Sequence, residues 1–212
     1  NANYTASGLS TGVYYLRIRT RDAAGNLADT VYDAFTYWHD ATNPTSPGVV
    51  AGDPAGYTNV NLFTFLWSVG TDSDSGIDEY CYKTGEVGAT ESCISSTSVA
   101  GILAYQDNVN TFYVRSKDVA GNLAASYAQV NYYYNGSAPS EPQSLAVTPE
   151  TSASNSFTFS WARPDVYTGS ISRYHYSINA LPTALNTTTT TSTSIGPSAF
   201  ATQQGVNTFY VV

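Results

Sequence analysis

Alternating apolar and polar residues mark the chain as a succession of β-strands. In the segment 62–67, Phe63, Phe65 and Trp67 occupy every second position, and the segment 112–117 alternates in the same way. Because successive side chains of a strand point to opposite faces, each segment predicts a strand with one face in a core. No window shows apolar residues at helical spacing, so the pattern predicts an all-β fold.

Turn residues divide these strands. Tyr80 and Tyr82 flank Cys81 on a further predicted strand. The segment 118–122 reads Asp-Val-Ala-Gly-Asn, which predicts a turn because Gly and Asn tolerate positive φ and an Asp side chain caps its own loop. A final strand is predicted over 125–134.

The chain also repeats itself. Residues 13–28 (VYYLRIRTRDAAGNLA) match residues 109–124 (VNTFYVRSKDVAGNLA) at an offset of 96 positions. Residues 63–67 (FTFLW) match residues 157–161 (FTFSW) at an offset of 94. A period of this size indicates an array of one structural unit.

Three copies follow from this period. Residues 43–137 are predicted to form a complete repeat, 1–42 the C-terminal part of a preceding one, and 138–212 a repeat that lacks its final strand. Proline-rich junctions at 43–47 and 138–142 predict stiff linkers and an end-to-end array. The cut copies leave two interpretations: an excised segment of a longer chain, or repeats completed by strand exchange with a neighbouring subunit.

Composition narrows the function classes. The net charge of −8 excludes nucleic acid as a partner, because nucleic-acid binding relies on Lys and Arg that neutralise phosphates. The sequence has no run of about 18 apolar residues, so it predicts no membrane-spanning segment. The chain contains no Met, so we interpret it as a segment or the mature part of a longer precursor.

These motifs together resemble a known class of domain. An aromatic-x-aromatic-x-Trp strand, a Tyr-x-Tyr strand, the D-x-A-G-N turn and P-x-x-P junctions are similar to bacterial-type immunoglobulin-like and fibronectin type III-like extracellular repeats. The resemblance covers essentially the whole chain and implies tandem β-sandwiches at an extracellular or cell-surface location. One departure concerns Cys81 and Cys93, which are too close in sequence for the inter-sheet disulfide of antibody domains.

The two cysteines are candidates for a different bond. Cys81 and Cys93 lie on predicted adjacent strands joined through the Gly85–Gly88 turn, a spacing that allows a cross-strand disulfide in an oxidising compartment. Two buried thiols in a reducing compartment are the alternative. His175 stands at the Cys81 position of the next copy, so the fold does not require the bond.

Candidate glycosylation sites fall in predicted loops or at strand ends. Asn3, Asn135 and Asn186 each begin an N-x-S/T sequence, which predicts covalent glycans on an extracellular protein. The hydroxyl-rich tract after Asn186 offers O-glycosylation sites at Thr187, Thr188, Thr189, Thr190 and Thr191. Alternatively, this tract is simply an exposed strand, since Thr has a high β-propensity.

A calcium site is suggested by one acidic loop. Asp72 and Asp74 form the D-x-D-x-G opening typical of calcium loops, but Lys83 occupies the twelfth position, where such loops carry Glu. A solvated turn is therefore the stronger interpretation, and no cofactor is expected. Asp22 or Asp118 offers a second candidate for calcium at repeat junctions.

No catalytic residue is predicted, because His39 and His175 lack partners at a recognisable motif. The leading hypothesis is a structural fibre, stalk or filament whose partners are neighbouring copies of itself. An adhesin or carbohydrate-binding segment is a second hypothesis, with Tyr37, Trp38 and the Tyr132–Tyr134 cluster as surfaces for sugar rings. The third is a spacer in a secreted polysaccharide-active enzyme.

Overall fold

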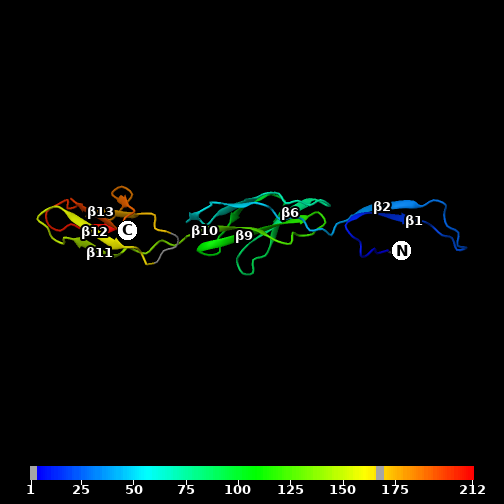
Figure 1. Ribbon diagram of the computed structural model, residues 1–212, viewed down its shortest axis with the longest axis horizontal. Helices are drawn as coiled ribbons and strands as arrows, with labels where there is room; N and C mark the ends of the chain where they lie inside the picture. The colour runs from blue at the N-terminus through cyan, green and yellow to red at the C-terminus, as the bar shows by residue number, and fades with distance from the viewer. Residues whose placement is uncertain (1–3, 166–169) are drawn as a thin grey trace. The chain divides into compact units, whose positions relative to one another are not determined.

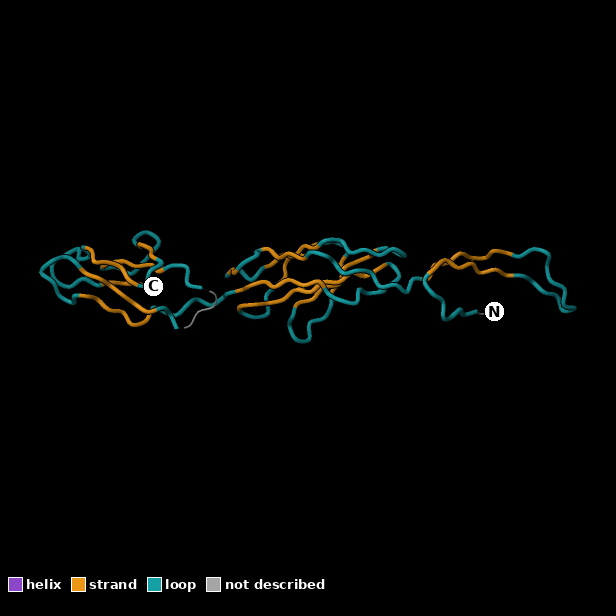
Figure 2. The backbone as a smooth tube through the Cα atoms, viewed as in Figure 1, coloured by secondary structure: helices purple, strands orange, loops and turns teal. Residues whose placement is uncertain are grey.

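The computed structural model describes residues 4–165 and 170–212. Within these residues it contains strands, turns and loops and no helix (Figure 2). Accordingly, the described part of the chain offers no helix long and apolar enough to cross a membrane. The chain divides into two compact units, residues 1–56 with 61–133 and residues 57–60 with 134–212.

The first two strands form an antiparallel hairpin. Strand β1 (Gly12–Ile18) pairs with β2 (Tyr32–His39) (Figure 1). The register sets Tyr14 opposite Tyr37. The two rings stack with their centroids 5.7 Å apart. The Tyr14 hydroxyl donates to the carbonyl of Ser10 at 2.6 Å, which ties the chain before β1 to the hairpin.

The middle sandwich, strands β3 to β10, consists of two antiparallel sheets. One sheet has the order β3-β5-β8 and the other the order β4-β10-β9-β6-β7. The strands are β3 (Val50–Asp53), β4 (Tyr57–Thr58), β5 (Phe63–Trp67), β6 (Ile77–Thr84), β7 (Ser92–Ile94), β8 (Ser98–Ile102), β9 (Asn108–Asp118) and β10 (Ala128–Tyr134). The final strand thus begins three residues later than predicted, because the chain bends at 125–126.

Aromatic side chains fill the space between these two sheets. Phe65 on β5 stacks on Phe112 on β9 at 4.0 Å between centroids, and Trp67 meets Tyr80 edge-on at 5.7 Å. Phe63 packs against the Tyr132 ring at 4.7 Å. Each of these six side chains is buried. Burial stabilises the fold by about 1.5–3 kcal/mol for a fully buried Phe. The predicted core face of 63–67 is confirmed.

Strand β9 alternates as the sequence predicts. Its buried positions are Phe112, Val114, Ser116 and Asp118. The residues between them, Tyr113, Arg115 and Lys117, are half-buried on the outer face of the sheet. This outer face is therefore the surface of the middle sandwich on which polar side chains gather.

The C-terminal sandwich repeats this core. Its sheets have the orders β11-β12-β15 and β14-β13-β16. The strands are β11 (Gln143–Thr148), β12 (Phe157–Ala162), β13 (Tyr174–Ile178), β14 (Thr188–Thr190), β15 (Ser194–Ser198) and β16 (Phe209–Val211). Phe159 stacks on Phe209 at 4.1 Å and Trp161 meets Tyr174 at 5.4 Å, which reproduces the aromatic pairs of the middle sandwich. The sequence repeat is thus a structural repeat.

Candidate functional site

The D-x-A-G-N segment forms the same turn in both copies. The Asp118 carboxylate accepts hydrogen bonds from the backbone and side-chain nitrogens of Asn122, each at 2.8 Å. Asp22 accepts the same two bonds from Asn26, also at 2.8 Å. The glycine of each turn has a φ of +98° or +96°, which other residues rarely adopt. These bonds lower the pKa of Asp22, the Asn26 side chain having the largest effect.

The second of these turns also holds the segment that follows β2. The side-chain amide of Asn122 donates to the carbonyl of Asp40 at 3.2 Å. Asp40 in turn accepts the Thr42 amide at 2.8 Å, and the Thr45 amide donates to the Thr71 carbonyl at 2.9 Å. The linker between the hairpin and the middle sandwich is therefore anchored by several polar contacts.

Three carboxylates meet at this linker. One oxygen from each of Asp40, Asp72 and Asp118 lies within 4.8 Å of the others. Their oxygens already cap turns: Asp72 Oδ2 accepts the amides of residues 74–76, and hydrogen bonding, first from Ser75, lowers the pKa of Asp40. The structure thus joins Asp72 to this group and leaves Asp74 exposed outside it. Calcium binding by Asp72 and Asp74 stays a prediction.

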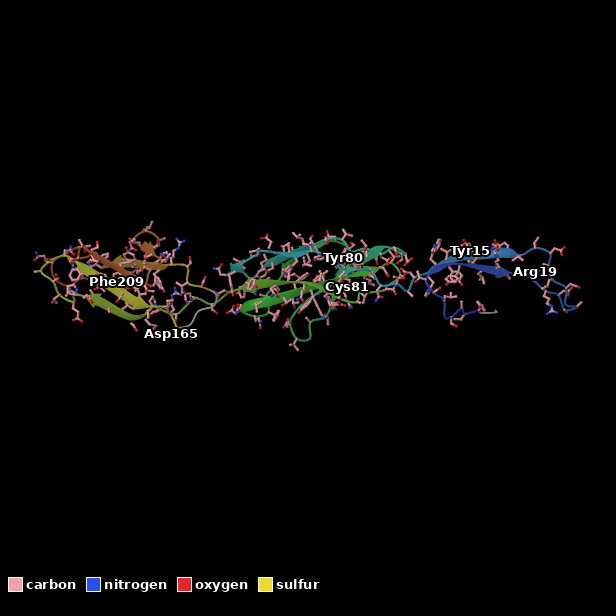
Figure 3. The ribbon with its side chains drawn as sticks, viewed as in Figure 1. Tyr15, Arg19, Tyr80, Cys81, Asp165 and Phe209 are labelled. Carbon is pink, nitrogen blue, oxygen red and sulfur yellow. A yellow bond between two sulfur atoms is a disulfide. The ribbon has the colours of Figure 1, made fainter. Side chains whose placement is uncertain are left out.

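Cys81 and Cys93 stand opposite each other on β6 and β7 and form a disulfide. Figure 3 shows Cys81 beside Tyr80 on β6. In the C-terminal sandwich the Cys81 position carries His175, which pairs with Thr189 on the neighbouring strand. That copy keeps the strand pair without the covalent bond.

The candidate glycosylation residues have different surroundings. Asn3 lies outside the described residues. Asn135 is half-buried, and its backbone amide donates to the Thr58 carbonyl at 2.9 Å. Asn186 is exposed, and its side-chain oxygen accepts the Thr183 amide at 2.7 Å. Part of the threonine tract is strand β14, and glycosylation at all these positions stays a prediction.

The aromatic residues proposed for sugar contact divide into two groups. Tyr132 is only 1% exposed and belongs to the core, so the prediction that it offers a surface ring is wrong. Tyr37 is half-buried against Tyr14. Trp38, next to it on β2, points to the other face of the hairpin and is 75% exposed.

A polar cluster on the outer face of the middle sandwich was not predicted. Arg115 donates to both oxygens of Glu91, at 2.7 and 2.6 Å, and the Tyr127 hydroxyl donates to the same carboxylate. The charged groups of Arg115 and Lys83 each lie 4.8 Å from the Tyr127 ring centroid, and Tyr113 meets that ring edge-on. The bond from Arg115 lowers the pKa of Glu91, whereas burial raises the pKa of Tyr127.

Beside this cluster the surface is hollowed. A cavity of about 310 Å³ is lined by Lys83, Glu86, Tyr113, Tyr127 and the turn that joins β6 to β7. The residues come from three separate segments of the sequence, and the sheet brings them together through the β6–β9 pairing. We call this cavity the Lys83 hollow.

Two curated proteins match part of the chain. Chitinase A1 of Niallia circulans is 33% identical over 128 residues, which are 58% of this chain and 18% of that protein. Exoglucanase A of Cellulomonas fimi is 31% identical over 118 residues, 54% of this chain and 13% of that protein. The chain therefore spans less than a fifth of the length of either relative. No family model matches it.

Solved structures of fibronectin arrays also align with the chain. The FN1-FN3 domains of chicken CNTN1 align at 15% identity and a TM-score of 0.36, covering 93% of this chain and 64% of that one. The central fibronectin-III array of RIM-binding protein aligns at 15% identity and a TM-score of 0.34, covering 81% and 63%.

The strand order decides the fold. In the middle sandwich the first, second and fifth main strands (β3, β5, β8) face a sheet of the third, fourth, sixth and seventh (β6, β7, β9, β10). The chain consists of tandem fibronectin type III-like domains. The two histidines contact backbone groups. His39 Nδ1 lies 3.2 Å from the Ser10 carbonyl, and the His175 backbone bonds that of Val212 at 2.9 Å. Neither contact joins a nucleophile to a base.

Proposed function

We propose that this chain is a non-catalytic spacer within a secreted polysaccharide-active protein. The similarity to chitinase A1 and exoglucanase A carries the proposal. Both matches, at 128 and 118 residues, exceed the 96-residue offset between copies, so each extends beyond one domain into the next. Both relatives are named as enzymes that act on polysaccharides, which favours a spacer over the structural fibre.

The anchored linker supports this function. A spacer must hold its neighbours at a defined separation, which a freely flexible linker does not do. Here Asn122 is hydrogen-bonded to Asp40, and Thr45 to Thr71. The rings of Pro44 and Pro47 also fix their own φ angles in this segment. The segment after β2 thus has few conformations available to it.

An extracellular location fits the same function. The Cys81–Cys93 disulfide persists in oxidising surroundings and is rare in a reducing cytosol. Glycans at Asn3, Asn135 or Asn186 belong to the same location and cover a surface with few charges. We propose the same extracellular location for the whole protein.

Deleting this segment from the full-length secreted protein tests the proposal. A spacer positions other domains on an insoluble substrate, so the deletion should slow hydrolysis of insoluble chitin or cellulose severalfold and leave hydrolysis of a soluble oligosaccharide unchanged. Replacing the segment with an unrelated rigid linker of equal length is the matched control and should restore the rate. Absence of polysaccharide hydrolysis in the intact protein would refute the proposal.

A further inference from the structure

The Lys83 hollow is a feature that a spacer does not need. Its wall is rigid, because the Tyr127 ring is held by its hydroxyl bond to Glu91 and by the Lys83 and Arg115 charges. The edge-on contact with Tyr113, at 5.9 Å between centroids, fixes the second ring. A site whose side chains are already ordered loses little conformational entropy when a ligand binds.

Lys83 forms no direct ion pair among the described residues, although its charge helps to lower the pKa of Glu91. Its neighbours on the same sheet are paired, Arg115 with Glu91 at 2.6 Å and Lys117 with Glu79 at 2.7 Å. The ammonium group of Lys83 has three N–H donors, and the contact described for it is with the face of Tyr127. Donors at the rim of a hollow are therefore available to an acceptor that enters it.

Comparison of the copies shows that the fold does not need these residues. The Lys83 position carries Ser177 in the C-terminal sandwich, and the Tyr113 position carries Arg17 in the hairpin. Both copies nevertheless keep their strand pairs, although the register of the hairpin shifts between Leu16 and Arg17. The combination of Lys83 and Tyr113 is thus specific to the middle sandwich, as a binding site would be.

The chemistry of the wall selects the class of ligand. The hollow carries one positive and one negative side chain, Lys83 and Glu86, which together favour a neutral ligand over a phosphate or another anion. The rings of Tyr113 and Tyr127 offer an apolar face to a ligand, and the charged groups of Lys83 and Glu86 can hydrogen-bond its hydroxyl groups. A volume of about 310 Å³ is at the small end of ligand sites, so the hollow suits one unit of a chain and not a long segment.

We propose that the Lys83 hollow binds a neutral sugar unit of a polysaccharide. Tyr113 lies against the apolar face of the sugar ring, and Lys83 and Glu86 bond its hydroxyl groups. This inference rests on the proposed function, because it makes the spacer a second contact with the substrate. The polysaccharide would be held along the spacer while other domains act on it.

Hydrogen–deuterium exchange on the full-length protein tests the site locally. Chitohexaose and cellohexaose are the probes, and a hexamer of a uronic acid is the anionic comparison. At least one neutral hexamer should slow exchange in the peptides that span residues 82–91 and 109–118. Lys83→Ala and Tyr113→Ala should each raise the hexamer concentration needed for the same protection about tenfold, as the loss of one strong contact predicts.

The control variants separate binding from folding. Tyr113→Phe keeps the ring and should keep the protection, whereas Lys117→Ala removes a paired lysine outside the hollow and should not change it. If exchange is unchanged with both neutral hexamers in a protein that still hydrolyses polysaccharide, the sugar site is overturned and the spacer function is not. Protection by the uronic acid only overturns the choice of a neutral sugar. A protein without polysaccharide activity overturns the proposed function as well.

Discussion

Replacement of Asp118 by Ala should destabilise its domain much more than the same change at Asp22 destabilises the hairpin. Both residues accept two hydrogen bonds from the Asn of their turn. Asp118 is fully buried, whereas Asp22 is exposed. The pair therefore compares one turn in two environments.

The magnitude follows from what the change leaves behind. Asp118→Ala removes two charge-assisted bonds, each worth roughly 1.5 kcal/mol or more, and leaves the amide groups of Asn122 without their acceptor. The free energy of unfolding should fall by about 3 kcal/mol, which corresponds to a drop of about 15 °C in the melting temperature of a domain of this size. Asn122 also bonds Asp40, so the linker loses part of its anchorage.

Differential scanning calorimetry of the two variants measures this difference. The transition of the middle sandwich should move to lower temperature in Asp118→Ala, whereas no transition of the protein should move appreciably in Asp22→Ala. A shift below about 4 °C for Asp118→Ala, roughly 1 kcal/mol, would refute the reasoning. Equal shifts in both variants would refute it too, because burial would then not decide the effect.

Three further predictions concern the core and the disulfide. Phe65→Ala should cost about 4 kcal/mol in urea unfolding, because it empties the stack on Phe112, and a loss under 1 kcal/mol would contradict the packing described. Cys93→Ser should lower stability by about 3 kcal/mol, since the bond closes a loop with a sequence separation of 12, while the transition of the C-terminal sandwich should not move; calorimetry checks both. Burial raises the pKa of Tyr132 to about 12 from 10.0, so the folded state favours the neutral phenol. The contribution of this raised pKa to the free energy of unfolding is complete below pH 10, and about 3 kcal/mol of it is lost between pH 10 and 12. Alkaline denaturation of Tyr132→Phe should not show this loss.

The sequence predicts the parts of this structure that depend on local pattern. The buried faces of 63–67 and of β9 follow from strict alternation, and the repeat places the same faces in a second copy. The Asp118 turn follows from a glycine and an asparagine at positions that need positive φ or a side-chain cap. Such features are fixed by neighbours in the chain.

Other features depend on tertiary packing and could not be predicted in this way. Three consecutive tyrosines at 132–134 give no alternation, so their pattern does not show that Tyr132 is the buried one. The Lys83 hollow combines segments near 83, 113 and 127, whose distance in space is set by the strand pairing. One signal for the hollow does exist in the sequence, because Ser177 stands at the Lys83 position of the next copy.

Electron microscopy of the native secreted protein, with intact-mass measurement of the same sample, tests the account most directly. A spacer of fibronectin type III-like domains predicts dispersed single molecules whose mass exceeds this segment several times, because the relatives are over five times longer than the matched part. Regular fibres built from copies of this chain would contradict the account and restore the structural filament as its function.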